Sequence, residues 1–486
     1  MLTIGDSVQS GGRLARRPFL SVGSAGLAGL AGLSGLFGQA SLFGQAGLFE
    51  QAGQGIAAAP ENSPAARFLR DRSVIFLFMH GGPSQFETFD PKTEGPSNTH
   101  SQTGAIATSI PGISFGSTFT ELAKRAHLIN IVRSFVTGDG NHDIKPVVGA
   151  ATNRANLGSL YARVAGANRP ATAMPTNITL FPPVVIKDAG PPIVDFGNFA
   201  AAGDLGPAYA PLVPGGSAGF QEDMRLHLPQ DRLGDRRGLL AELDRGKRWR
   251  DLAALRSVSA IQDSAFDALL RGVSDAFDLD KEDPRLVDRY DTAPHFRPES
   301  IDKKWNNHKH YADHGQSIGR LLLLARRLCE RGAGFVTVTT SFVWDMHADI
   351  NNAPVTEGMR YVGAPFDHAV AAFIDDVEAR GLSDKILLVC CGEMGRTPQL
   401  NAAGGRDHWG GLAPLLLYGG GLGKGRVVGR SSRDGGEPAS DAVTIPDLIG
   451  TITRSLLDLS EVRLLDSLPK SLQATLSQGR PIPGLG

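Results

Sequence analysis

Cysteine is scarce in this sequence, which contains only 3 cysteines among 486 residues. Cys390 and Cys391 are adjacent within an apolar run, and neighbouring side chains of a strand point to opposite faces. So few cysteines argue against a disulfide scaffold and against a CxxC zinc site. Net charge is also nearly absent, at -1, so electrostatics gives no reason to expect a nucleic acid or an anionic membrane surface as partner.

Several common catalytic motifs are missing as well. The letters G-x-S-x-G occur at 112–116, 215–219 and 315–319, but none of these directly follows a predicted strand. There is thus no nucleophile elbow, which leaves a serine esterase of the α/β-hydrolase type poorly supported. There is neither a P-loop nor a dinucleotide-binding fingerprint. The glycine-rich run 419–425 follows the last predicted strand and lacks the full motif.

The N-terminal region has the pattern of a targeting signal. Arg16-Arg17 is followed by Pro-Phe-Leu and an uncharged Gly/Ala/Leu stretch, a pattern that resembles a twin-arginine export signal. Three short repeats over 35–52 extend this region into a low-complexity leader, with a possible cleavage zone at 57–59. We expect residues 1–64 to address the protein to the periplasm or the extracellular space through the twin-arginine machinery. A chance arginine pair in a flexible leader is the alternative.

Residues 65–486 are predicted to form one α/β domain with a largely parallel sheet. Short apolar runs that predict buried strands occur at 73–80, 127–134, 332–340, 386–391 and 412–418. Helices are expected near 313–331, 365–380 and 445–457, the last with Thr444 as its N-cap. The third and fourth strands then form a β-α-β unit with a parallel, right-handed connection. The charged segment 220–312 predicts a helical insertion that covers one side of the sheet.

Ionisable side chains follow four of these strands. Ligands of open α/β sheets bind outside the carboxyl ends of the strands. Imidazole and carboxylate groups together suit zinc, manganese or iron. We therefore expect a divalent metal, zinc or manganese, with ligands drawn from His80, Asp345, His347, Glu393, Asp407 and His408.

Other roles stay open for several of these residues. His80 at a strand end also fits a hydrogen-bonded structural histidine, and Asp407 also fits a residue that orients His408. Glu393 is a ligand, a general base or a salt-bridge partner of Arg396. Arg396 in turn fits bidentate binding of a phosphate- or sulfate-like oxyanion. Ser84, after Gly-Gly-Pro, fits a nucleophile or a turn residue that caps a helix.

Five segments together resemble one bacterial family. These are HGGPSQFETFDPK (80–92), AFDLDKEDPRLVDRY (276–290), LLLARRLCERGAGFVTV (322–338), WDMH (344–347) and GEMGRTPQLNAAGGRDHW (392–409). The combination is similar to domain-of-unknown-function family 1501, which looks like a relative of sulfatases and alkaline phosphatases. The resemblance implies an alkaline-phosphatase-like three-layer sandwich with metals at the strand ends. By motif position, Asp345, His347 and His408 resemble the Asp and two His of one metal in the wider superfamily.

The resemblance has two departures. His80 replaces the aspartate that ends the first strand of the superfamily. Residues 141–153 look similar to the nucleophile segment of sulfatases, but the nucleophilic Cys or Ser is missing, and His142 and Asp143 stand near its place. The nucleophile is therefore open between Ser84, a metal-bound water and none.

Two functions follow as hypotheses. The first is an exported metal-dependent hydrolase of phosphate or sulfate esters, with a small-molecule or polysaccharide substrate. Arg396 and Arg133 would offset charge on the oxyanion, and His142 or Glu393 would act as acid or base. The alternative is a catalytically silent exported protein that binds, for example, a sulfated polysaccharide or an envelope component. The missing nucleophile favours the second, and the clustered ionisable groups favour the first.

Overall fold

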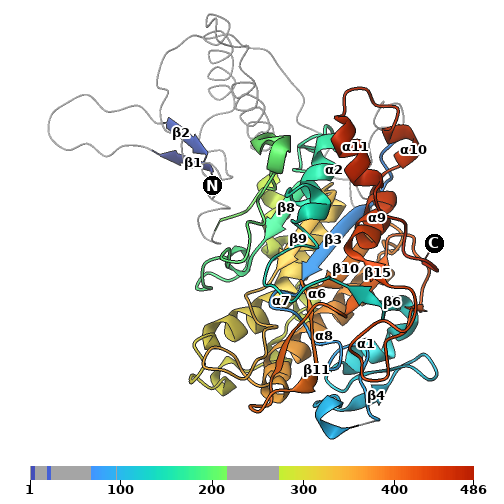
Figure 1. Ribbon diagram of the computed structural model, residues 1–486. Coiled ribbons are helices and arrows are strands. Elements are labelled where there is room, and N and C mark those ends of the chain that lie inside the picture. The colour runs from blue at the N-terminus through green and yellow to red at the C-terminus, as the bar shows by residue number, and fades with distance from the viewer. Residues whose placement is uncertain (1, 6–18, 23–66, 95, 216–272, 486) are drawn as a thin grey trace, which may run out of the picture.

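The computed structural model describes residues 2–5, 19–22, 67–94, 96–215 and 273–485 (Figure 1). Most of the leader 1–64, including Arg16-Arg17, and residues 220–272 of the expected insertion lie outside the described residues. Near the N-terminus, strand β1 (Leu2–Gly5) pairs in antiparallel fashion with β2 (Phe19–Val22).

The centre of the fold is a seven-stranded sheet with the order β14-β6-β13-β10-β3-β9-β8. Strand β13 runs antiparallel to both of its neighbours, and all other neighbouring pairs are parallel. The protein is thus a mixed α/β protein with a mostly parallel central sheet, as predicted. The strands are β3 (Ser73–Phe78), β6 (Ile129–Val132), β8 (Asn177–Leu180), β9 (Phe335–Thr339), β10 (Ile386–Cys391), β13 (Leu415–Gly419) and β14 (Val427–Val428).

Helices cover both faces of this sheet, which explains why β3, β9 and β10 are buried at every position. Along β3, Ile75 and Leu77 face one core, while Val74, Phe76 and Phe78 face the other. The adjacent cysteines of β10 are divided between the same two cores, as their neighbouring positions predict. Burying each side chain of this size contributes about 1.5–3 kcal/mol. The first core is covered by α7 (His308–Glu330) and α8 (Val355–Ala379), and the second by α2 (Leu157–Ala165), α9 (Ile445–Leu456) and α11 (Lys470–Ser477).

The start of α8 differs from the prediction, whereas the start of α9 agrees with it. Helix α8 begins at Val355, ahead of the expected start near Pro365, and includes that proline. Its buried positions Val355, Met359, Val362 and Phe366 keep helical spacing up to and past the proline, so packing outweighs the local preference for a break. Helix α9 begins after Thr444, whose backbone N–H donates to Asp447 Oδ2 at 3.0 Å, as expected of an N-cap.

The described part of the insertion, residues 273–312, packs on the α7/α8 layer. It contains α6 (Pro284–Arg289) and several single helical turns, and its apolar side chains join the first core. Arg326 of α7 is fully buried and forms ion pairs with Glu282, Glu330 and Asp376, which fastens the insertion to both helices. Residues 273–307 thus add short helical elements to the α7/α8 side of the sheet.

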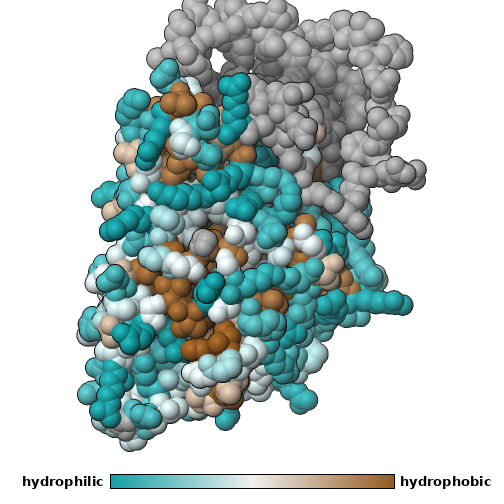
Figure 2. All heavy atoms as spheres, turned by 90° about the vertical axis from the view of Figure 1, so that its right-hand side faces the viewer, coloured by the Kyte–Doolittle hydropathy of each residue, from teal (hydrophilic) through white to brown (hydrophobic). Residues whose placement is uncertain are grey.

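Short two-stranded ladders flank the main sheet. They pair β4 (Ala105–Ala107) with β5 (Ser114–Gly116), β7 (Phe135–Val136) with β15 (Val443–Thr444), and β11 (Gly395–Leu400) with β12 (Arg406–Trp409). The remaining α-helices of the described ranges are α1 (Thr120–Lys124) and α10 (Leu459–Val462). Figure 2 shows one face of the molecule, on which hydrophobic residues gather near the centre among hydrophilic ones. Within the described ranges, no helix is long and apolar enough to cross a membrane.

Candidate metal centre

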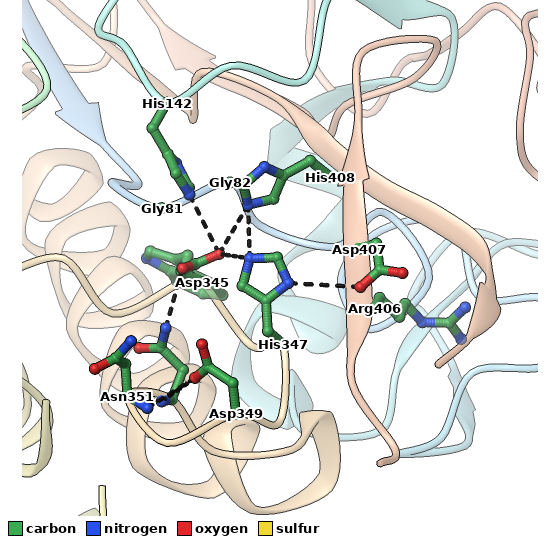
Figure 3. Close-up of polar contacts among 12 residues, drawn as sticks. Gly81, Gly82, His142, Asp345, His347, Asp349, Asn351, Arg406, Asp407 and His408 are labelled. Carbon is green, nitrogen blue, oxygen red and sulfur yellow. Dashed lines mark hydrogen bonds and ion pairs between the residues drawn. The ribbon is translucent and has the colours of Figure 1, made fainter. Parts of the chain in front are cut away.

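Four ionisable side chains from distant parts of the chain converge at one place (Figure 3). His142 lies in the segment after β7, Asp345 and His347 lie in the segment after β9, and His408 lies on β12. One ligand atom from each residue lies within 4.8 Å of those of the other three. Because β9, β3 and β10 are parallel neighbours, the segments that follow them meet at one edge of the sheet. We call these four residues the four-residue cluster.

The carboxylate of Asp345 is the centre of the cluster. Its Oδ1 lies 2.8 Å from His347 Nε2, 3.2 Å from His408 Nε2 and 3.5 Å from His142 Nε2. The two nitrogens His347 Nε2 and His408 Nε2 are 2.7 Å apart. Burial raises the pKa of Asp345, but hydrogen bonds from the three imidazoles and the charge of Arg396 outweigh it and hold the pKa well below its usual range. The carboxylate is therefore ionised.

This donor set fits a divalent metal ion. Zinc bonds of about 2.0–2.1 Å in tetrahedral geometry place neighbouring donor atoms roughly 3.3 Å apart, close to the spacings of the cluster. Two imidazole nitrogens at such short range repel each other when both present a lone pair, unless a proton or a cation lies between them. Three imidazoles and one carboxylate suit zinc, manganese or iron. The three histidine side chains are 14%, 22% and 29% exposed for His142, His347 and His408, so a solute can reach the cluster.

Glu393 lies behind His142 rather than in the cluster. Its fully buried carboxylate accepts the N–H of Gly81 at 2.9 Å and lies 3.1 Å from His142 Nδ1. Nδ1 therefore carries the proton, and the lone pair of Nε2 points toward the cluster. Burial lowers the pKa of His142, but Asp345 and Glu393 more than offset that effect, so its pKa is raised. The sequence allowed Glu393 to be a ligand, but in this geometry it positions His142.

Arg396 is buried, and its side chain forms a salt bridge with Asp345. Its guanidinium donates to Asp345 Oδ1 at 2.7 Å, to Gly82 O at 2.7 Å and to Arg406 O at 3.1 Å, and also to Gly81 O. Its salt-bridge partner is thus Asp345, and the expected pairing with Glu393 is not the one observed. With these donors engaged and the side chain buried, Arg396 is not free to bind an oxyanion directly. It holds the central carboxylate of the four-residue cluster instead.

His80 does not join the cluster. It continues the alternation of Phe76 and Phe78 on β3, and its ring packs at 5.0 to 5.9 Å from four phenylalanine rings. Its ring nitrogens have no hydrogen-bond partner among the described residues. Burial lowers its pKa to about 3, so the ring is neutral. Its backbone carbonyl accepts the N–H of Trp344 at 3.0 Å, which positions the residue before Asp345. The predicted ligand is a structural residue here.

Asp407 stands beside a different histidine from the one expected. Neighbouring residues of β12 point to opposite faces, so Asp407 and His408 diverge. Asp407 Oδ1 lies 3.6 Å from His347 Nδ1 and accepts a hydrogen bond from Asn401 Nδ2 at 3.1 Å. Its side chain is 62% exposed. It is placed to orient His347, and not to bind a metal held by the four Nε2 and Oδ1 donors.

Two further candidates lie in other networks. The Ser84 hydroxyl donates to Glu87 and accepts the N–H of Phe86, which is the turn-residue role. Arg133 donates to Phe89 O at 2.7 Å and Ser114 O at 2.9 Å and pairs with Asp90. Neither residue contacts the four-residue cluster, because their local backbone partners fix both side chains elsewhere. Throughout the described parts of the chain, no hydroxyl or thiol is hydrogen-bonded to the side chains of the cluster.

One supporting residue gave no signal in the sequence. Asn352 is buried, and its Nδ2 donates to Asp345 Oδ2 at 3.0 Å, so both carboxylate oxygens of Asp345 are held. Its own Oδ1 accepts from Asn307 at 2.8 Å. An asparagine in a polar loop has no distinguishing pattern, and only the fold shows its contact.

Fold and site together define a mixed α/β protein with a candidate metal centre at the carboxyl ends of parallel strands. Residues 71–479 match the family described as "Protein of unknown function (DUF1501)", and the chain belongs to that family. The resemblance noted from the five segments is thereby confirmed. No curated protein matches the chain.

Several solved structures are similar to the chain at 10–12% sequence identity. The crystal structure of Ps i-CgsB is similar with a TM-score of 0.34 over 84% of this chain and 77% of that one. The phosphonate monoester hydrolase SpPMH from Silicibacter pomeroyi is similar with a TM-score of 0.35 over 85% and 76%. The phosphonate monoester hydrolase of Agrobacterium radiobacter is similar with a TM-score of 0.28 over 85% and 78%.

Proposed function

We propose that the protein is a metal-dependent hydrolase of phosphate or sulfate esters on an alkaline-phosphatase-like scaffold. The observation that carries the proposal is the convergence of three imidazole nitrogens and one ionised carboxylate at a solvent-accessible sheet edge. A divalent ion bound there would polarise an ester oxygen and lower the pKa of a bound water. Zinc and manganese are the ions that this donor set suits.

The charges around the cluster favour an anionic substrate. Asp345 and Glu393 contribute two negative charges, and Arg396 contributes one positive charge. A divalent ion brings the sum to one positive charge in a partly buried site, where such a charge is weakly screened. An anionic ester is therefore attracted to the loaded site, whereas the protein without metal presents a net negative one.

The cluster residues would bind the metal, and the residues around them position their side chains. Glu393 fixes the tautomer of His142, Asp407 lies against His347, and Arg396 with Asn352 holds both oxygens of Asp345. With no hydroxyl or thiol bonded to the cluster in the described residues, water is the nucleophile that this site favours. Glu393 is enclosed, so it acts through His142 and not on the substrate.

A catalytically silent binding protein is the second candidate. The observation that favours it is the same lack of a hydroxyl or thiol at the cluster within the described ranges. Such a protein would bind metal and an anionic ligand, such as a sulfated polysaccharide, without turnover.

Elemental analysis of purified protein tests both candidates. We expect zinc or manganese near one equivalent per chain, and its loss when Asp345 and His408 are both changed to alanine. Leu464→Ala, a change on the surface, is the control and should retain the metal. Turnover of 4-nitrophenyl phosphate or sulfate that disappears with the metal supports the hydrolase. Stoichiometric metal without turnover supports the silent protein, and metal-free protein in every sample refutes the metal centre.

The domain and export hypotheses also stand as proposals. We propose that residues 65–486 form one domain behind a twin-arginine signal and leader at 1–64. Changing Arg16 and Arg17 to lysine should trap the protein in the cytoplasm, as followed by cell fractionation. Unchanged export of that variant would refute the signal.

A further inference from the structure

An aromatic wall borders the four-residue cluster on the side of His142. Phe196 and Phe342 stack on each other with ring centroids 4.6 Å apart and planes at 25°. Both rings also contact the imidazole of His142, at 5.1 Å and 4.8 Å. Phe342 follows β9, and Phe196 comes from the loop before Gly203, so two separate segments build this wall against one histidine of the cluster.

The wall is backed by a rigid apolar layer. Behind it lies the neutral ring of His80, at 5.0 Å from Phe342 and 5.7 Å from Phe196. Phe199 packs on His80 at 5.9 Å and closes the layer. Phe342, Phe199 and His80 are buried, whereas Phe196 is half-buried. The ring of Phe196 is thus the member of this layer that a solute at the cluster can touch.

Two exposed apolar side chains lie close in the sequence to the wall or to the cluster. Among the described residues, the large hydrophobic side chains that are exposed are Val194 at 51%, Ile350 at 72% and Leu464 at 73%. Val194 lies two residues before Phe196, and Ile350 lies three residues after His347. Two of the three therefore belong to the loops that carry the wall and a predicted ligand. Ligand-binding sites are lined mainly by apolar and aromatic side chains, with a few placed polar groups.

We propose that Phe196 determines specificity by stacking on an aromatic or other planar apolar group of the ester. This inference rests on the proposed function and narrows its substrate class. The anionic head binds at the metal centre, while the adjoining group lies on the ring of Phe196, which offers no hydrogen-bonding partner. Offset or edge-on aromatic contact adds to the gain from burial. The combined effect should be about tenfold in affinity.

Titration calorimetry with non-hydrolysable anions tests this inference. The full chain loaded with zinc or manganese is titrated with phenylphosphonate and with methylphosphonate, which share the head group and differ in the planar group. Benzenesulfonate and methanesulfonate form the matching pair for a sulfate-directed site. We expect the aromatic member to bind about tenfold more tightly in the wild type.

Substitutions assign the preference to the wall. Phe196→Ala should remove the preference for the aromatic compound over the methyl compound, and Phe196→Leu should keep part of it. Leu464→Ala is the control, because Leu464 follows α10, which lies at the end of the molecule away from β11 (Figure 1). Metal content of each variant verifies that the site is loaded.

The outcomes separate this inference from the proposed function. If none of the four anions binds to loaded protein, the proposed function fails, and the inference fails with it. If the anions bind but the wild type shows no preference for the aromatic member, only the inference is overturned. A preference that survives in Phe196→Ala also overturns the inference and leaves the hydrolase proposal intact.

Discussion

Replacing Glu393 tests whether a buried carboxylate controls the metal centre through His142. Glu393→Gln keeps the shape of the side chain and one acceptor for the His142 Nδ1 proton, which lies 3.1 Å away, but removes the charge. The imidazole then becomes a weaker ligand because no anion supports it. Partners of this kind typically change metal affinity by about 10- to 100-fold. Glu393→Ala goes further, because it leaves the buried Gly81 N–H and His142 Nδ1–H without an acceptor.

The two substitutions should lower the free energy of unfolding by different amounts and under different conditions. Each unsatisfied buried donor costs about 1–3 kcal/mol, so Glu393→Ala should lose about 2–6 kcal/mol of stability even in the presence of a chelator. For Glu393→Gln, the loss of stability relative to the wild type should appear mainly when metal is present. A metal concentration of about 100 times the wild-type Kd stabilises the wild type by about 2.7 kcal/mol, and a 30-fold weaker Kd reduces this to about 0.9 kcal/mol.

Denaturant unfolding with and without metal measures both quantities, and competition with a chromophoric chelator gives the metal Kd directly. Asp376→Asn is the matched control, since Asp376 is also a buried carboxylate but pairs with Arg326 and Arg380 on the α7/α8 layer. It should lower stability without altering metal affinity. Wild-type metal affinity in both Glu393 variants would falsify the positioning role.

Three further substitutions probe the scaffold of the site. A Cβ at Gly81 would lie 2.7 Å from Asp345 N, at a φ of +112°, so Gly81→Ala should weaken metal binding at least tenfold. The control is Gly112→Ala, at a φ of +76° with open space around it, which should leave metal binding unchanged. Competition with a chelator measures the metal affinity of both variants. Arg396→Met leaves the Asp345 carboxylate without its buried partner and should cost about 3–5 kcal/mol in chemical denaturation, and a loss below 1 kcal/mol would contradict its enclosed role. Burial lowers the pKa of His314 to about 4. Because the unfolded state then binds more protons, stability should fall as the pH drops from about 6.5 to 4, by about 3 kcal/mol for this residue, and His314→Gln should lose this part of the pH dependence.

The sheet was largely predictable because its signal is local. Apolar runs bounded by turns mark β3 and β10 within one or two residues, and buried strands need no alternation to be recognised. The direction of β13 had no comparable signal, since an apolar run is the same whether it lies parallel or antiparallel. The early start of α8 was missed because Pro365 suggested a helix beginning, while the deciding contacts are tertiary.

The candidate metal centre was predictable in position more than in detail. Asp345, His347 and His408 were expected as ligands, and the structure brings them together with His142, for which an acid–base role was expected. The role of His80 depends on which face of β3 the alternation assigns to it, and the sequence does not tell which partner covers that face. The divergence of Asp407 from His408 follows only once residues 406–409 are known to be a strand, and their polar sequence conceals it.

The antiparallel pairing of β10 with β13 has a consequence for how the protein can change. The two strands are hydrogen-bonded neighbours, so the connecting segment 392–414 leaves and re-enters the sheet at the same edge. Glu393, Arg396 and His408 all lie on it, while its tip carries the exposed residues Ala402 and Ala403. Doubling the length of a flexible loop costs only about 0.6 kcal/mol. Residues inserted at this tip could therefore add a new recognition surface beside the cluster without shifting the register of a single central strand.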